Sequence, residues 1–189
     1  MVNGPQQPAL ADVEALVLEH LGAGYNLARW FLRNPHDAED AVQDACIRAL
    51  RGTTGYAGGS GKAWFLTIVR NVCLTRIRRA VSPKVVRLDD VVTQIDQQSA
   101  ADSQHAASTR PDLLLIANLD RHRVSQAIAR LPENFREVIV LREIEELSYS
   151  DIAAVVGVPI GTVMSRLARG RERLKLLLSA DKEGRQDEL

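Results

Sequence analysis

The chain has 189 residues, of which 46% are hydrophobic and 25% are charged, a composition typical of a globular protein with one domain or two small ones. It contains no run of about 18 apolar residues, so no membrane-spanning helix is predicted, and its first residues lack the pattern of a secretory signal. Cys46 and Cys73 stand far apart in helix-like segments, which predicts neither a disulfide framework nor a zinc site. We therefore expect a protein of the reducing cytoplasm.

The 24 basic and 24 acidic residues cancel in number but not in position. Residues 61–88 contain seven basic residues and no acidic one, whereas residues 89–120 contain six acidic residues and one basic residue. Residues 158–176 are basic again, with five basic residues and one acidic residue. The net charge of zero is therefore an average over segments of opposite charge, and it does not exclude a nucleic-acid partner.

The first third of the chain is predicted to be helical. Apolar residues recur at helical spacing over residues 12–21 and 25–33. A third helix is predicted to begin after Asn34, which can cap it, with Pro35 at the first helical position. One face of this helix is apolar and another is acidic; the first consists of Ala38, Val42, Ala45 and Ala49, and the second of Asp37, Asp40 and Asp44.

A glycine-rich segment over residues 52–61 precedes Lys62 and looks like a phosphate-binding loop at first sight. That motif requires Gly where the chain has Tyr56 and Ser or Thr where it has Ala63, and it follows a strand that is not predicted here. A long connection is the better interpretation. The next helix, predicted over residues 63–79, is apolar at its start and basic at its end.

The second half begins with residues 80–111, whose polar and acidic composition is typical of a flexible linker. A helix is predicted over residues 112–130, followed by three more as far as residue 178. The charged tail from Ser179 is expected to fray.

A helix-turn-helix unit is predicted near the C-terminus. Residues 150–156 end at Gly157, which favours a left-handed helix stop, and Pro159 is expected to open the next helix. Arginines along a helix face can hold guanine bases bidentately in the major groove. This interpretation is favoured over a merely solvated basic face. We expect Val163, Leu167 and Leu174 on the buried side of the second helix, and Thr162, Ser165, Arg166 and Arg169 on the DNA side.

Three stretches of the chain resemble the extracytoplasmic-function sigma factors, the small two-domain class of bacterial transcription initiation factors. "DAEDAVQDACIRAL" is similar to the polymerase-binding helix of that family, and "AWFLTIVRN…RIRR" is similar to the helix that engages the −10 promoter element. "LPENFREVIVLREIEELSYSDIAAVVGVPIGTVMSRLARGRERL" resembles the domain that reads the −35 element. The resemblance implies an all-α fold of two small helical domains joined by a flexible linker, with the helix-turn-helix in the second. It assigns residues 10–80 to the first domain, called sigma region 2, residues 81–111 to the linker, and residues 112–178 to the second domain, called sigma region 4.

The resemblance also implies partners. The acidic helix would dock on a coiled coil of the polymerase β′ subunit, and region 4 would contact the β flap. An anti-sigma factor, often membrane-tethered in this family, would hold the protein inactive. No cofactor and no small-molecule substrate are expected. The polymerase-binding residues implied in this way are Asp37, Asp40, Gln43 and Asp44.

The basic helix would contact the −10 element. Trp64 could stack on an unpaired base, but a core position is equally consistent with the sequence, and Phe65 is expected in the core. Met164 stands where many relatives have a basic residue, which removes one possible DNA contact. The residues implied for the −10 contact are Trp64, Asn71, Arg76, Arg78 and Arg79, the arginines mainly as phosphate contacts.

Two other classes of function fit these features less well than a sigma factor. A conventional helix-turn-helix regulator that binds DNA alone would not need the acidic helix or the second basic block. An enzyme such as a nuclease is disfavoured because the four histidines are scattered without the spacing of metal ligands or acid–base pairs. The sequence therefore predicts a non-catalytic promoter-specificity subunit.

Overall fold

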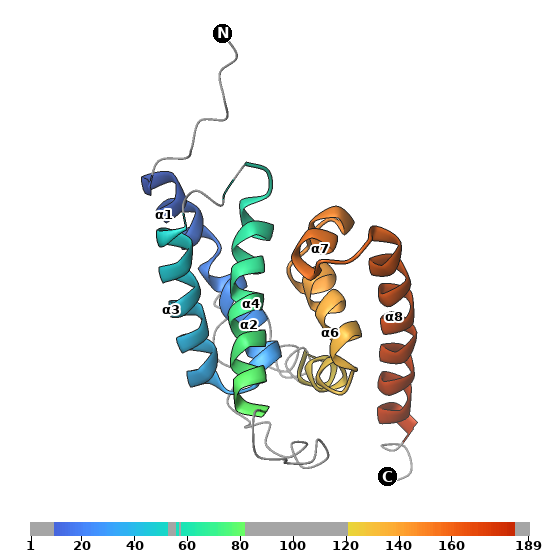
Figure 1. The fold of residues 1–189 in the computed structure, drawn as a ribbon. Helices are drawn as coiled ribbons and strands as arrows, with labels where there is room; N and C mark the ends of the chain where they lie inside the picture. The colour runs from blue at the N-terminus through green and yellow to red at the C-terminus, as the bar shows by residue number, and fades with distance from the viewer. Residues whose placement is uncertain (1–9, 53–55, 57, 82–120, 184–189) are drawn as a thin grey trace, which may run out of the picture.

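The computed structural model describes residues 10–52, 56, 58–81 and 121–183, and the regular structure in these ranges is entirely helical (Figure 1). This confirms the predicted all-α fold class. The predicted linker, the start of the helix expected at residue 112 and the end of the charged tail lie outside the described residues. The N-terminal half contains α1 (Leu10–Glu19), α2 (Leu21–Leu32), α3 (Pro35–Arg51) and α4 (Gly61–Val81). The C-terminal half contains helical residues 121–129, α6 (Glu133–Ile139), the π-helical turn η2 (Val140–Ile144), α7 (Tyr149–Val156) and α8 (Ile160–Glu183).

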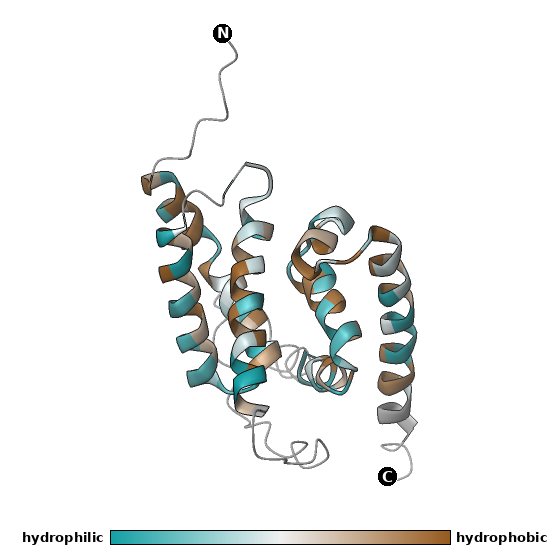
Figure 2. Cartoon of the chain, in the orientation of Figure 1, coloured by the Kyte–Doolittle hydropathy of each residue, from teal (hydrophilic) through white to brown (hydrophobic). Residues whose placement is uncertain are grey.

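Helices α2, α3 and α4 pack together into the core of the N-terminal half. Asn34 caps α3 as predicted, because its Oδ1 accepts a hydrogen bond from the backbone N–H of His36 at 2.9 Å. Hydrophobic and hydrophilic residues alternate along α3 and α4 (Figure 2), as expected for helices with one face in a core. The predicted apolar stripe of α3 is confirmed; Ala38, Val42, Ala45 and Ala49 are all buried.

Helices α2 and α4 approach each other closely at a glycine. A Cβ atom added to Gly24 of α2 would lie 2.8 Å from Cε1 of Phe65 in α4. Phe65 is completely buried, as predicted, so it has little freedom to move away. Glycine at position 24 therefore allows α2 to pack directly against the largest side chain of the core.

The C-terminal half has the helix-turn-helix that the sequence predicts. Gly157 ends α7 with φ 74°, and its N–H donates to the carbonyl oxygen of Ala153 at 2.9 Å. Pro159 lies just before α8 rather than inside its first turn, because the helix begins at Ile160. Ser148, which the sequence reading did not identify as a cap, accepts from the N–H of Asp151 at 3.1 Å and starts α7.

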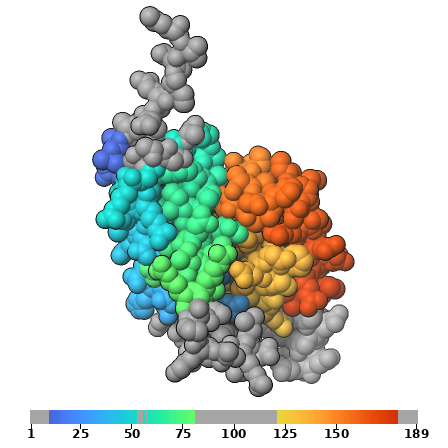
Figure 3. Space-filling view, in the orientation of Figure 1, coloured from blue at the N-terminus to red at the C-terminus, as the bar shows by residue number. Residues whose placement is uncertain are grey.

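The two halves are in contact with each other. Helix α4 packs against α7, and α2 lies against η2. Figure 3 shows the N-terminal half, blue to green, closed against the C-terminal half, yellow to red.

No single helix among the described residues has the length and hydropathy to cross a membrane. Only α7 together with residues Ile160–Ser179 meets those two criteria, as a pair bent by 100°.

Candidate nucleic-acid and protein interfaces

The second helix of the helix-turn-helix presents a polar face. Val163 and Leu167 are buried, which fixes the orientation of α8 on the core of the C-terminal half. Ser165 and Arg169 are exposed on the predicted DNA side, whereas Thr162 and Arg166 are half-buried. The hydroxyl of Ser165 donates to the carbonyl oxygen of Thr162 at 3.0 Å, so its lone pairs stay available to a base or phosphate.

Met164 adds an apolar group to this polar face. Its side chain is 53% exposed, although methionine usually packs inside a protein. An exposed apolar side chain on such a face can contact the methyl group of thymine in the major groove. Leu174, predicted on the buried side, is half-buried and packs against the core about two turns beyond Leu167 along α8.

The basic end of α4 offers a second polar surface. Asn71, Arg78 and Arg79 are exposed, so their polar groups can reach a ligand in solution. Trp64 is half-buried, and its ring centroid lies 5.3 Å from that of Tyr56, with the rings tilted by 50°. The sequence left open whether Trp64 lies in the core or is available to stack on a base. In the structure one part of its side chain packs against the core and another part is exposed.

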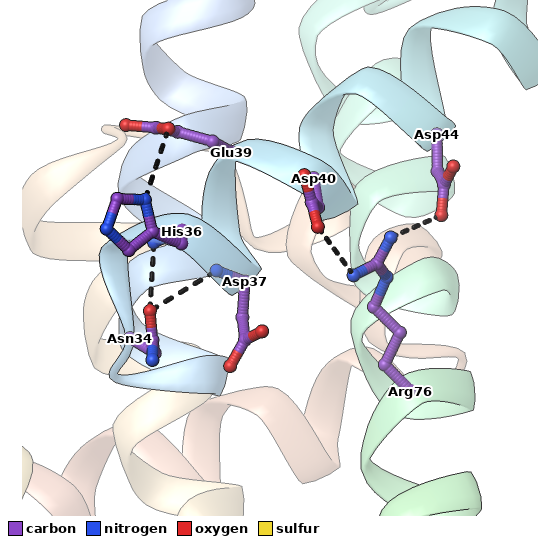
Figure 4. A network of polar contacts seen from close by, with 7 residues as sticks. All are labelled: Asn34, His36, Asp37, Glu39, Asp40, Asp44 and Arg76. Carbon is purple, nitrogen blue, oxygen red and sulfur yellow. Dashed lines mark hydrogen bonds and ion pairs between the residues drawn. The ribbon is translucent and has the colours of Figure 1, made fainter.

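Arg76 differs from the other arginines of α4 because it is joined to α3. Its Nη2 atom donates to Oδ2 of Asp44 at 2.6 Å, and its Nη1 atom lies 3.9 Å from Oδ2 of Asp40 (Figure 4). The hydrogen bond to Asp44 is the main cause that raises the pKa of Arg76 above its ordinary value. From the sequence, Arg76 is expected to contact DNA, and Asp40 and Asp44 are expected to contact polymerase. The sequence gives no signal that these residues contact each other.

The acidic face of α3 remains accessible despite this contact. Asp37 and Gln43 are exposed, and the side chains of Asp40 and Asp44 are 65% and 46% exposed. Arg76 lies beside two of the three carboxylates and offsets part of their mutual repulsion. The result is a helix face with a surplus of negative charge, suited to a basic partner.

Four charged residues that the predicted sites did not include join the two halves. Lys62 Nζ lies 2.9 Å from Oε2 of Glu145, and Arg70 Nε is paired with Oε1 of Glu137. Glu137 and Glu145 are only 7% and 4% exposed. The sequence signal was weak, because the stretch "EVIVLREIEEL" also contains Arg142, Glu143 and Glu146, and nothing in it marks which carboxylates are buried and need a partner.

The two thiols differ in burial, but burial raises the pKa of both. Cys73 is completely buried, and this burial is the main cause that raises its pKa to about 12. Burial also raises the pKa of Cys46, which is partly exposed. Within the described ranges, no group of three or more His, Cys, Asp or Glu residues has the arrangement to hold a metal ion.

Two family models match the chain, one on each half. Sigma-70 region 2 matches residues 16–82, and Sigma-70, region 4 matches residues 121–174. The matches leave a gap between them, in agreement with two helical domains.

Full-length relatives are similar over most of the chain. The ECF RNA polymerase sigma factor SigW of Bacillus subtilis is 31% identical over 175 residues, which cover 92% of this chain and 91% of SigW. SigE of Mycolicibacterium smegmatis, another ECF RNA polymerase sigma factor, is 34% identical over 169 residues, or 89% of this chain. The aligned part spans 62% of the length of SigE, so that relative is considerably longer.

Two solved structures share the fold. The sigma factor RpoE of Bartonella quintana, crystallised with the anti-sigma factor NepR, has a TM-score of 0.67 and 29% identity, covering 90% of this chain and 98% of RpoE. CnrH, solved with the cytosolic domain of CnrY, has a TM-score of 0.61 and 26% identity, covering 91% of this chain and 96% of CnrH.

Proposed function

The chain belongs to the extracytoplasmic-function (ECF) RNA polymerase sigma factors, and from this premise we propose that it binds core polymerase and directs it to a particular set of promoters. The observation that carries the proposal is the presence, in one small chain, of an acidic helix face and two separate basic helices. A subunit that joins polymerase to DNA needs both kinds of surface. It acts by binding and has no catalytic reaction of its own.

The N-terminal half is assigned to the polymerase and the −10 element. We assign residues 10–80 to this domain, 81–111 to the linker and 112–178 to the second domain. The acidic face of α3 docks on the β′ coiled coil, because it is exposed and its charge is only partly balanced by Arg76. The basic end of α4 contacts the −10 strand through phosphate and base groups. The residues assigned to the −10 contact are Trp64, Asn71, Arg76, Arg78 and Arg79.

The C-terminal half is assigned to the −35 element and the β flap. Helix α8 starts just after the tight turn around Gly157, and Val163 and Leu167 face the core, so the opposite face of its first turns is free to enter the major groove. Arg166 and Arg169 lie on the same face as the two hydroxyl residues. The residues assigned to base and phosphate contacts are Thr162, Ser165, Arg166 and Arg169.

The proposal includes a protein inhibitor. RpoE was crystallised with an anti-sigma factor and CnrH with a cytosolic domain of CnrY, and this chain has the fold of both. We place its activity in the cytoplasm, under the control of an anti-sigma factor that a membrane tether could hold near the cell surface.

Run-off transcription with core polymerase tests the proposal. Adding the protein should produce transcripts from defined start sites that core polymerase alone does not produce. If the protein binds a promoter by itself and leaves the start sites of the polymerase unchanged, it is a conventional helix-turn-helix regulator and the proposal is wrong.

Charge reversal on α3 tests the docking face. Asp40→Lys should abolish binding to core polymerase in co-sedimentation, because like charges brought together at an interface cost several kcal/mol. Glu39→Lys is the matched control, with the same charge change at the adjacent position; Figure 4 shows Glu39 on the side of α3 away from Asp40 and Arg76. Equal core binding by the two variants would show that the acidic face is only a solvated surface.

A further inference from the structure

We propose that Lys62 and Arg70 form a phosphate-binding pair on α4, and that the carboxylates of Glu145 and Glu137 occupy this pair while the two halves are closed on each other. The inference rests on the proposed function, because it adds two residues and a mode of regulation to the surface that contacts the −10 strand. Phosphate groups of DNA and the two glutamates would then compete for the same cations.

The ion pairs bring together residues far apart in the chain. Lys62 Nζ lies 2.9 Å from the Glu145 carboxylate and also donates to the backbone carbonyl oxygen of Glu145 at 2.7 Å. Arg70, two helical turns along α4, pairs with Glu137 of α6. The side chains of Lys62 and Arg70 are 28% and 18% exposed, so the contact removes most of their surface from solvent.

The cations belong to a helix that has no acidic residue of its own. Residues Gly61–Val81 of α4 contain two lysine or arginine residues facing the C-terminal half and further arginines beyond them. Within the N-terminal half, Asp40 and Asp44 of α3 lie beside Arg76 instead. The negative charge beside Lys62 and Arg70 therefore comes from the other domain.

The glutamates are unusual for a contact that only holds two domains together. They are the buried charged residues among those described, and every other buried residue near them in α6 and η2 is apolar. A buried ion pair contributes little net stability compared with apolar residues of similar size, because both charges lose their hydration. What a carboxylate offers at this place is an anionic oxygen, which is the same kind of ligand as a phosphate oxygen.

Besides the ion pairs, α4 packs against α7 across the boundary, and the other polar contacts there are long. Asn26 Nδ2 donates to Oε1 of Glu145 at a distance of 3.3 Å. Arg33 donates across the boundary to the carbonyl oxygen of Ala129 at 3.2 Å, and Arg136 of the C-terminal half donates to the same oxygen at 3.4 Å, which brings two like charges close together. An interface of this kind can open when a competitor binds one of its sides.

Closure would lower the DNA affinity of the free protein. If only the open form binds a strand, the apparent dissociation constant is the intrinsic one divided by the open fraction. A closed form that makes up about nine tenths of the molecules thus weakens binding about tenfold. Docking of the two halves at separate places on polymerase would remove this penalty.

Variants of the full chain that neutralise the glutamates test the proposal. In Glu137→Gln with Glu145→Gln, the side chains keep their size and lose their charge. The matched control is Glu143→Gln, since Glu143 lies in the same segment but pairs with Arg171 of its own half at 2.7 Å and is 45% exposed. The two readouts are the radius of gyration from small-angle X-ray scattering and the affinity for a short fluorescent single-stranded oligonucleotide without polymerase.

We expect the double variant to have a larger radius of gyration and to bind the oligonucleotide several-fold more tightly, with the control unchanged in both. The proposal is overturned if neither quantity changes, or if the molecule opens without binding more tightly. It is also overturned if binding tightens without opening, or if Glu143→Gln has the same effect, because reduced repulsion of DNA would then explain the result.

A second variant separates masking from a simple structural contact. Lys62→Gln with Arg70→Gln should also open the molecule, but it should bind the oligonucleotide more weakly. Loss of two phosphate contacts should reduce the slope of log affinity against log salt by about 1.4 for a single strand. An unchanged slope would remove both residues from the DNA surface. The proposed function is judged separately, because run-off transcription by the unmodified protein can fail while the two variants still open, or succeed while they stay closed.

Discussion

At the level of single residues, the basic side chains differ in what they contact rather than in their chemistry. Arg78 and Arg79 are exposed at the end of α4, while Arg76 is held by Asp44 and Arg70 by Glu137. A free arginine can gain a phosphate contact without losing another partner, whereas a paired arginine must first leave its carboxylate. The exposed arginines are therefore the ones whose loss should be seen most directly in DNA binding.

The contrast between Arg166 and Arg78 gives a prediction at this scale. Arg166→Ala should weaken binding to the −35 element by about 1–3 kcal/mol and relax the preference at one base pair, if it contacts a base. Arg78→Ala should weaken binding nearly equally for all promoters and flatten the salt slope by about one. Fluorescence anisotropy with promoter and scrambled duplexes over a salt series measures both. Equal, sequence-independent losses would show that Arg166 binds only phosphate.

At the level of elements, helix–helix distance in the N-terminal half depends on residue size. Gly24 sits where α2 meets Phe65 and Val69 of α4, while Gly22, in the first turn of the same helix, has no atom within 4 Å of the place where a Cβ would lie. Both glycines lie in α2, where glycine destabilises a helix relative to alanine because of its greater conformational freedom in the unfolded chain. The two positions differ in the atoms that surround them. This makes them a natural pair for comparison.

Substitution of these glycines should have opposite effects. Gly22→Ala should raise stability by up to about 1 kcal/mol, because alanine favours the helix and meets nothing. Gly24→Ala gains the same preference but forces the buried ring of Phe65 to move, and overpacking of this kind costs about 1–3 kcal/mol. The midpoints of chemical unfolding, followed by circular dichroism, distinguish the two. Similar midpoints for both variants would contradict the close packing of α2 on α4.

At the level of the whole molecule, two helical units meet through a boundary that combines helix packing with ion pairs, and the buried apolar residues of both units form one cluster. Phe65, Leu66 and Val69 fill the N-terminal core, and Ile139, Leu141 and Ile152 fill the C-terminal one. The boundary between them adds the two ion pairs of Lys62 and Arg70 to the packing of α4 on α7. Since the helices of each half pack mainly against one another, each half should hold its structure without the other.

Separate production of the two halves tests this independence. Residues 10–81 and residues 121–183 should each be helical, and their circular dichroism spectra should sum to the helical signal expected from the same residues in the intact chain. Each should also unfold cooperatively on heating. If either fragment is unfolded, its core depends on the other half and the division into two domains is wrong.

The sequence alone was sufficient for features that act over a few residues. The cap at Asn34, the left-handed stop at Gly157 and the apolar stripe of α3 depend on neighbours within one or two turns, and all three are confirmed. The π-helical turn over residues 140–144 was not predicted, because a single extra residue in a helix leaves almost no trace in apolar spacing. The roles assigned to the DNA- and polymerase-binding residues stay predictions.

Only the tertiary structure decided which charges meet. Arg76 and Asp44 are 32 residues apart, Arg70 and Glu137 are 67 apart, and Lys62 and Glu145 are 83 apart. Helical periodicity predicts that each of these residues lies on a helix, but not which helix it faces, because that depends on how whole helices pack. The physical reason is that an ion pair acts over a few ångströms in space, irrespective of separation along the chain. The sequence therefore determined the helices and the distribution of charge along the chain, and the packing of the two halves determined which of those charges remain free for a partner.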